Sequence, residues 1–255
     1  MRGAIIGDII GSSFINKNID SQDFQLFQET SAFTDDTILI ISTADALLNN
    51  LDYKESMIKW VKKYPEAGYR EQFLQWVSDN GTTEYVSGGE GAARRITPVG
   101  FAVSSIKEAV EESVRSTEIT HNIPVRLEAS QAASIAIYMA KHGATKQEIK
   151  SYISVHFGYD LSLDIEYWKN ELKSKELPET PVPPALAAFF QASDFEEAIR
   201  FAIYIGGPTS TIASIAGALA QAYFKHIPKS FERRALSRLT HELAQLISDF
   251  EEKYK

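Results

Sequence analysis

Apolar residues recur every three or four positions along most of the chain, which is the pattern of helices that bury one face. The clearest stretches are residues 40–51, 125–140, 212–223 and 236–250. The alternation of apolar and polar residues between turn dipeptides that is typical of strands does not recur as a set. The pattern therefore predicts an all-α fold in a single compact domain that spans residues 1–255.

Local signals place some of the helix ends. Thr145 with Glu148, and Ser193 with Glu196, have the spacing of a capping box and predict two helix starts. Four prolines interrupt the helical pattern between residues 173 and 184. Because apolar helical segments continue on both sides, we interpret residues 173–184 as a loop within one domain.

Composition narrows the classes of protein that the chain can belong to. With 255 residues, 44% of them hydrophobic, the chain can bury a large core. A formal net charge of -8 argues against a nucleic-acid-binding protein, which needs a basic surface. It does not exclude a small phosphate-bearing ligand, because backbone N–H groups at a helix start can hold one. The absence of cysteine excludes disulfides, thiolate metal sites and a cysteine nucleophile.

The first residues are a poor match to a targeting segment. The stretch before Phe14 has one basic residue, and Asp8 interrupts its apolar run. No run in the chain approaches the roughly 18 apolar residues of a membrane span. We therefore expect a cytoplasmic protein that does not enter membranes.

Two candidate clusters lie in the first part of the chain. Gly3, Gly7 and Gly11 repeat every four residues along an apolar segment, which favours close helix packing over function. No strand precedes them, so they are not a dinucleotide fingerprint. The motif TDDT at residues 34–37 directly precedes a predicted helix. A capping threonine with acids in the first turn explains it, and by itself this interpretation is favoured. The same oxygens would also suit Mg²⁺.

A third cluster, GGPTST at residues 206–211, precedes a helix rich in small residues. Glycines and hydroxyls at a helix start could cradle a phosphate. An interhelical turn with a serine or threonine cap and proline in the first turn explains the same residues, and without further context it is the preferred interpretation.

Taken together, these clusters and five further motifs follow a known order. The segments are residues 3–11, 33–37, 87–98, 120–121, 157–161, 184–186, 193–198 and 206–218. In this order they resemble the ADP-ribosylglycohydrolase family, which includes the dinitrogenase reductase-activating glycohydrolases. Residues 34–37 match the TDDT signature in full, and residues 87–98 resemble the GNGAAMR-type loop. Residues 206–211 stand where the family has GGDSDT or GGDTDT.

The resemblance implies an all-α domain of orthogonally packed helices with two Mg²⁺ ions at the bottom of an ADP-ribose cleft. The metals would orient the ribose and the attacking water. Asp35 and Asp36 would be the catalytic residues. The residues implied as metal ligands are Thr34, Asp35, Asp36 and Thr211.

The resemblance also implies contacts to the diphosphate and the neighbouring ribose of ADP-ribose. They would come from the glycine-rich loop and from a histidine ahead of a small-residue helix. The residues implied are Ser87, Gly88, Gly89, Glu90, Gly91 and His121. Four aromatic residues (Trp60, Tyr64, Tyr69 and Trp76) could stack on an adenine, but such spacing is more typical of core residues.

The departures from the family concentrate on its chemistry. Pro208 and Ser210 replace the two aspartates of the last motif, so that only Thr211 matches there. Ile15 stands near the position of a family glutamate that assists catalysis in several branches. Glu90 replaces the asparagine of the glycine-rich loop and places a negative charge close to the expected diphosphate.

The charge balance follows from these departures. Two Mg²⁺ ions bring four positive charges, which active members can offset with four aspartates, whereas this chain offers only Asp35 and Asp36. Asp8 is interpreted as a residue that supports the helices. Neutral hydroxyls are poor replacements for carboxylates as Mg²⁺ ligands. We therefore expect at most one weakly held Mg²⁺ ion, or none, and metal-dependent hydrolysis that is impaired or absent.

Three functions fit this sequence. The first is a hydrolase of ADP-ribosylated protein or a related glycoside that works with one metal ion. The second is a non-catalytic sensor that binds ADP-ribose or a nucleotide in the cleft. The third is a pseudoenzyme that binds a protein partner and leaves the cleft unused. The sequence leaves the linkage, the acceptor and any protein partner open.

Overall fold

The structure is a computed structural model that describes residues 1–15, 17–89, 91–173 and 180–255. The described residues form helices joined by loops, without strands, so the predicted all-α fold is confirmed. In chain order the elements are α1 (Arg2–Gly11), the 3-10 helix η1 (Ser12–Phe14), α2 (Asp35–Asn49), α3 (Tyr53–Lys63), α4 (Glu71–Ser78), α5 (Gly91–Arg95), α6 (Thr97–Ala102), α7 (Ile106–His121), α8 (Pro124–Lys141), α9 (Lys146–Phe157), α10 (Ile165–Lys173), α11 (Val182–Gln191), α12 (Phe195–Ile205), α13 (Thr209–Phe224), α14 (Lys229–Leu236) and α15 (His241–Lys253).

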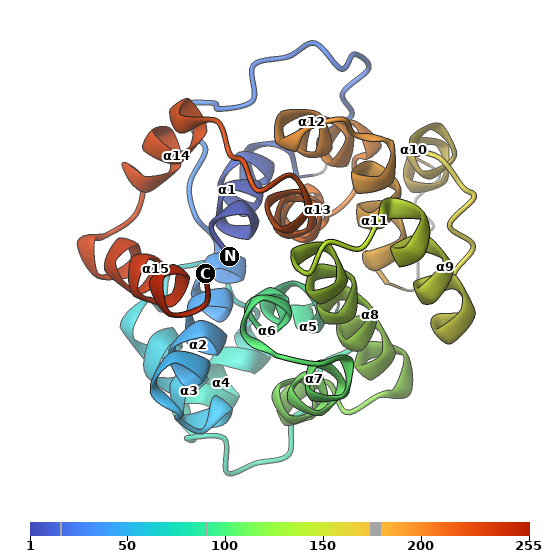
Figure 1. Cartoon of the computed structure of the whole chain (residues 1–255). Helices are drawn as coiled ribbons and strands as arrows, with labels where there is room; N and C mark the ends of the chain where they lie inside the picture. The colour runs from blue at the N-terminus through green and yellow to red at the C-terminus, as the bar shows by residue number, and fades with distance from the viewer. Residues whose placement is uncertain (16, 90, 174–179) are drawn as a thin grey trace.

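The core is built around α13, which lies beside α1 in the middle of the molecule (Figure 1). Residues 209–220 of α13 are all buried, because this helix is made almost entirely of small and apolar side chains. Helices α8, α11 and α12 pack against it from other sides. A helix that is apolar all round is stable only when other helices surround it. This explains why the amphipathic helices form an outer ring.

Glycines allow α1 and α13 to approach each other closely. A Cβ atom at Gly3 or Gly7 would overlap the carbonyl oxygen of Gly217 or Ala213, and one at Gly11 would lie 2.6 Å from Cα of Ser210. The packing role predicted for these glycines is therefore confirmed. The close contact places residues 34–37 and residues 206–211 next to each other.

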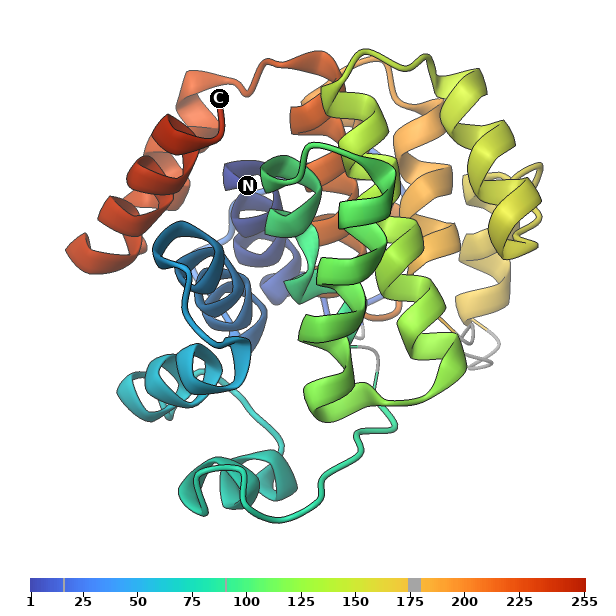
Figure 2. The ribbon, with the colours of Figure 1, turned by 60° about the horizontal axis from the view of Figure 1, so that its bottom comes forward.

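A second, smaller group of buried side chains lies between α2, α3 and α4, at the lower edge of Figure 2. Its members are Leu39, Met57, Val61, Phe73, Trp76 and Val77. Trp60 belongs to the main core and is 2% exposed, and Trp76 is 4% exposed. The two tryptophans are core residues, as their spacing suggested.

Two details of the predicted helix ends are wrong. The N-cap of α12 is Asp194, whose carboxylate accepts from the backbone N–H of Glu197. The helix therefore begins one residue later than a cap at Ser193 predicts. The prolines near residue 184 do not all belong to a loop, because α11 begins at Val182 and includes Pro183 and Pro184. Proline is tolerated in a first turn, where backbone N–H groups have no helical acceptor. Residues 174–179 of the predicted loop lie outside the described residues, whereas the capping box of Thr145 is confirmed.

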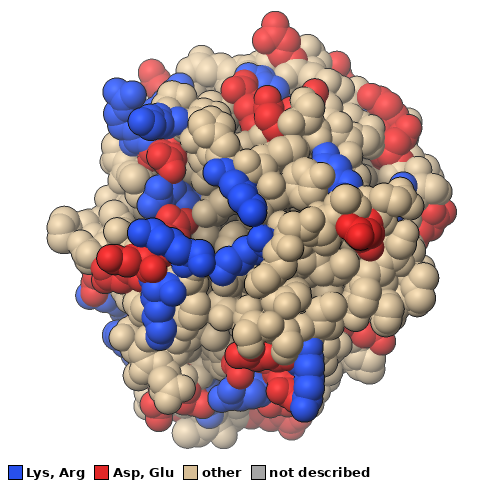
Figure 3. Space-filling view, viewed as in Figure 1, with Lys and Arg blue, Asp and Glu red and all other residues tan. Residues whose placement is uncertain are grey.

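No helix among the described residues is long and apolar enough to cross a membrane. Charged side chains of both signs are mixed over the face seen in Figure 3. Near the two ends of the chain this face is hollowed, and the hollow is lined by Arg2, Lys141 and Lys225 together with Glu232 and Glu251.

Candidate functional site

Asp8 organises the start of α2. Its side chain is fully buried in α1, and its carboxylate accepts hydrogen bonds from the backbone N–H and hydroxyl of Thr34, at 2.9 and 2.7 Å. It accepts two more from the N–H and hydroxyl of Thr37, at 3.2 and 2.6 Å. Burial raises the pKa of the Asp8 carboxyl to about 6, although these donors favour its ionised form. Asp8 therefore ties α1 to the TDDT segment.

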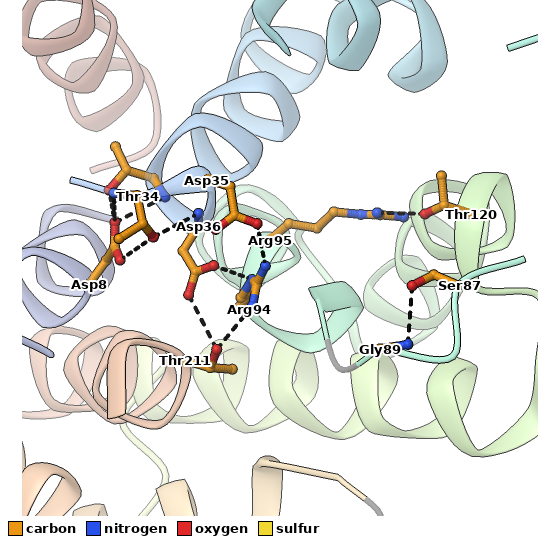
Figure 4. A network of polar contacts seen from close by, with 11 residues as sticks. Asp8, Thr34, Asp35, Asp36, Ser87, Gly89, Arg94, Arg95, Thr120 and Thr211 are labelled. Carbon is orange, nitrogen blue, oxygen red and sulfur yellow. Dashed lines mark hydrogen bonds and ion pairs between the residues drawn. The ribbon is translucent and has the colours of Figure 1, made fainter. Parts of the chain in front are cut away.

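Thr34 is the N-cap of α2, as its position before the two acids predicts. Its hydroxyl oxygen accepts from the N–H of Asp36 at 3.1 Å, while its proton goes to Asp8. The cap directs the next two side chains away from Asp8 (Figure 4). Thr34 is thus a structural partner of Asp8, and its hydroxyl is already engaged on both sides.

Asp35 and Asp36 meet the guanidinium group of Arg94, which projects from α5 (Figure 4). Nη2 of Arg94 lies 2.8 Å from Oδ2 of Asp35, and its Nε lies 2.5 Å from Oδ1 of Asp36. Its Nη1 donates to the hydroxyl of Thr211 at 3.0 Å, and that hydroxyl donates to Oδ2 of Asp36 at 3.3 Å. Burial raises the pKa of the Asp36 carboxyl well above its ordinary value, and the charge of Arg94 works against that rise.

Three of the four predicted metal ligands, Asp35, Asp36 and Thr211, therefore come together, but around an arginine. Arg94 was not singled out by sequence reasoning. The available signal was the charge balance, because two adjacent acids that lack the facing aspartates of the family, and of which Asp36 is buried, need a cation nearby. An arginine in the neighbouring glycine-rich segment was the obvious source of one.

The turn before α13 explains how Thr211 reaches the site. Gly206 and Gly207 have φ angles of 89° and 67°, a region that favours glycine. Pro208 is the N-cap of α13 and provides no side-chain cap, so the expected serine or threonine cap is wrong. The hydroxyl of Thr209 instead donates to the carbonyl of Gly11 at 2.8 Å. This bond holds the start of α13 against the end of α1.

The glycine-rich loop is attached to the end of α7. Ser87 donates its N–H to the carbonyl of Thr120 at 2.6 Å, and the N–H of Gly89 donates to the hydroxyl of Ser87 at 3.1 Å. Arg126 of α8 donates to the carbonyl of Gly88 at 3.0 Å. Glu90 lies outside the described residues.

His121 ends α7 and is held in one orientation. Its Nδ1 lies 2.8 Å from the hydroxyl of Thr120, which also accepts from Nη1 of Arg95 at 2.8 Å. The hydroxyl proton can then go to Nδ1, which places the imidazole proton on Nε2. Burial and the charge of Arg95 lower the pKa of His121 to about 2, so the ring is neutral. Nε2 is buried and has no hydrogen-bond partner among the described residues.

A cavity joins these features. Its lining consists of Asp35, Leu39, Arg70, Phe73, Tyr85, Ser87, Gly89, Gly91, Arg94, Arg95 and His121. Four of the residues predicted to bind the ligand are in this list, and Gly88 is not. Sequence reasoning missed Arg70, Phe73 and Tyr85, because α4 and the segment after it contain no motif. Their contribution depends on how the chain folds back toward α7.

Comparison with known proteins identifies the family. A family model described as ADP-ribosylglycohydrolase matches residues 1–255, the whole chain. The chain belongs to the ADP-ribosylglycohydrolase family. Several curated members of this family are similar to it. They include the ADP-ribosylarginine hydrolase Tri1 of Pseudomonas putida (strain GB-1), at 21% identity over 97% of this chain and 76% of that protein.

Other relatives support the same family. The ADP-ribosylhydrolase ARH3 of Gallus gallus is 22% identical, over 91% of this chain and 87% of its own length. A solved structure titled ADP-ribosylglycohydrolase-related protein complex shares the fold with a TM-score of 0.72. It is 23% identical and is covered to 95%, with 99% of this chain matched.

The site does not fit the two Mg²⁺ ions that the ADP-ribosylglycohydrolase family implies. Among the described residues, no three histidine, aspartate or glutamate side chains are close enough together to hold a metal ion. Pro208 offers no side-chain oxygen. Ile15 is 41% exposed and provides no acid. The two remaining acids already hold Arg94, whose positive charge would repel a divalent cation.

Proposed function

We propose that this member of the ADP-ribosylglycohydrolase family binds an ADP-ribosyl group in the cavity beside Arg94 and does not hydrolyse it by the two-metal route. The observation that carries the proposal is the buried Nε2 of His121, which has no hydrogen-bond partner among the described residues and is a donor in the tautomer that the Thr120 hydroxyl favours. Leaving a buried donor unsatisfied costs about 1–3 kcal/mol. A ligand acceptor such as a phosphate or ribose oxygen would remove this cost.

The charges of the cavity favour an anion. Arg70, Arg94 and Arg95 line it together with one carboxylate, Asp35. Gly89 and Gly91 lie in the same lining and leave room for a ligand to approach the backbone. A diphosphate is the part of ADP-ribose that such a wall would hold.

The aromatic side of the cavity suits a flat group. The rings of Phe73 and Tyr85 lie 5.9 Å apart, and Tyr85 also packs 6.0 Å from Trp76. The cavity has a volume of about 100 Å³. Because small-molecule sites usually have about 300–1,000 Å³, it would enclose only part of ADP-ribose and leave the rest on the open face.

The names of two relatives support the class of ligand. One is an ADP-ribosylarginine hydrolase and the other an ADP-ribosylhydrolase. In this chain Arg94, Pro208 and Ser210 stand where the family resemblance implies the metal site, so binding is proposed without metal-dependent chemistry. The expected cytoplasmic location stays a prediction.

Calorimetry with ADP-ribose, in Mg²⁺ and in EDTA, tests the proposal. We expect binding of equal affinity in both, and no release of ADP-ribose from an ADP-ribosylated arginine substrate in Mg²⁺. His121→Phe keeps a ring but removes both ring nitrogens, and it should weaken binding about tenfold. His121→Gln, which keeps a donor, should lose less. His142→Gln, at an exposed histidine whose Nδ1 lies within hydrogen-bond distance of the carbonyl of Tyr138, serves as the matched control.

Each other outcome overturns the proposal in a defined way. Binding that requires Mg²⁺, together with turnover, would show a hydrolase that keeps a metal site. Absence of heat in both buffers would leave the cavity unused and favour a pseudoenzyme that binds a protein.

A further inference from the structure

The guanidinium group of Arg94 lies where three segments that are distant in sequence meet. It contacts Asp35 and Asp36 at the start of α2, at 2.8 and 2.5 Å, and Thr211 in the first turn of α13, at 3.0 Å. These are three of the four residues that the family resemblance assigns to metal binding. The fourth, Thr34, is turned toward Asp8 instead (Figure 4).

All three nitrogens of the guanidinium are used in these contacts. Its Nη2 and Nε face the two carboxylates and its Nη1 faces the hydroxyl. The other oxygen of Asp36 accepts from Thr211, so three hydrogen bonds and the ion pair from Nε to Asp36 close the group into a ring. The side chain of Arg94 is 17% exposed, and that of Asp36 is 1% exposed. A buried carboxylate in this setting requires a positive charge close by.

We propose that the guanidinium of Arg94 is the resident cation of this site and takes the place of a divalent metal ion. One guanidinium carries a single charge, donates hydrogen bonds to Asp35 and Thr211, and forms an ion pair with Asp36. It therefore needs neither of the acids that are replaced by Pro208 and Ser210. This explains why the TDDT acids remain although the acids of the facing motif are absent.

The same arrangement excludes a metal ion from its position. Mg²⁺ binds carboxylate oxygens at about 2.0–2.1 Å and requires near-octahedral geometry. Oδ1 of Asp36 and Oδ2 of Asp35 already face nitrogens of Arg94, and a cation inserted between them would meet a like charge. Metal binding thus requires the displacement of Arg94.

The direct test is a titration with MnCl₂, followed by the electron paramagnetic resonance of free Mn²⁺ and by calorimetry, in the absence of any nucleotide. The wild-type chain should bind no Mn²⁺ at millimolar concentration. Arg94→Met removes the charge at similar length and should create one site, with affinity at least about tenfold higher and a melting temperature that rises with MnCl₂. The double variant Arg94→Met with Asp36→Asn should lose that site again.

Two further variants test whether the loss of the positive charge at residue 94, and not a general disturbance of the cavity, creates the Mn²⁺ site. Arg94→Lys keeps a cation and should bind as little Mn²⁺ as the wild type. Arg70→Met removes an arginine that lines the same cavity but forms no ion pair with Asp35 or Asp36 among the described residues, and this variant should bind no Mn²⁺.

Two results would overturn the inference. One is Mn²⁺ binding by the wild-type chain with the affinity of the Arg94→Met variant. The other is a folded Arg94→Met variant, with an unchanged circular dichroism spectrum, that binds no Mn²⁺. The measurement on the wild type stands even if the variant does not fold. Because no nucleotide is present, failure of this inference and failure of ADP-ribose binding are seen in separate experiments.

Discussion

Arg94 and Arg95 are successive residues of α5, yet their guanidinium groups bind different partners (Figure 4). Arg94 pairs with two carboxylates and stays 17% exposed. Arg95 is 1% exposed and donates to the hydroxyl of Thr120 and to the carbonyl oxygens of Ser116 and Thr117. In the part of the chain that the structure describes, no carboxylate lies within ion-pair distance of it.

The difference shows in how each charge is stabilised. Burial lowers the pKa of Arg95 to about 9, and the charge of Arg94 adds to this effect. Its cation is held by neutral oxygens at the end of α7, where carbonyl dipoles favour positive charge. Arg94 is held by the carboxyl groups of Asp35 and Asp36. Arg95 therefore holds the end of α7 in place, whereas Arg94 offsets the charge at the start of α2.

The largest expected effect is on Arg95. Arg95→Met should lower the free energy of unfolding by about 3 kcal/mol, because it leaves a gap and removes the donors that hold the end of α7. Urea denaturation at neutral pH measures this. Arg115→Met, at a side chain that is 61% exposed, should change it by no more than about 0.5 kcal/mol. A loss below about 1 kcal/mol in the free energy of unfolding for Arg95→Met would mean that Arg95 does not hold the end of α7 in place.

The second effect is the pH dependence that His121 contributes on the Arg95 side. The pKa of His121 is lowered to about 2 in the folded chain, by burial first and then by Arg95 and Arg94. The unfolded chain therefore takes up a proton near pH 6.5 that the folded chain refuses, so stability falls as the pH falls. Between pH 7.5 and 5 the loss should be about 2 kcal/mol.

The variant His121→Gln isolates this contribution. Urea denaturation of both chains across that pH range should show a shallower decline for the variant, by about 2 kcal/mol in total. His142→Gln, at an exposed position, should decline as the wild type does. Parallel curves for wild type and His121→Gln would show that the ring is protonated in the folded chain.

The smallest effect concerns Thr211 on the Arg94 side. Thr211→Val keeps the shape of the side chain and removes the hydroxyl that accepts from Arg94 and donates to Asp36. We expect a loss of about 1 kcal/mol in the free energy of unfolding, because the ion pairs remain. Thr83→Val, at an exposed position, is the control. A loss as large as that of Arg95→Met would show that the hydroxyl, more than the carboxylates, holds Arg94.

Much of the fold could be predicted because it depends on the local spacing of apolar residues and on the small size of glycine. The helical periodicity gave the class, and the spacing of Gly3, Gly7 and Gly11 indicated a close helix contact. The errors at Ser193 and Pro183 arose where neighbouring residues offer the same chemistry one position apart. Asp194 caps as well as serine does, and proline can begin a helix as well as precede one.

The site was harder to predict, because its chemistry depends on the direction in which individual side chains point. The motifs correctly brought Asp35, Asp36 and Thr211 to one place, but no periodicity tells which way a five-residue helix turns two adjacent arginines. The role of Arg94 depends on that direction. Arg70, which directly precedes α4, and Tyr85, which follows it, join the cavity only through the path of the chain on either side of α4, which sequence spacing does not define.

The contact between α1 and α13 joins residues about two hundred positions apart, as the bond from Thr209 to Gly11 shows. During synthesis on the ribosome, α1 emerges first and must wait for nearly the whole chain before its partner appears. Until then Gly3, Gly7 and Gly11 have no helix to pack against. Long-range contacts of this kind slow folding and leave apolar surface exposed in the meantime. The contact of Thr211 with Arg94 and Asp36 can therefore form only late in translation, so a chain interrupted before residue 209 lacks it.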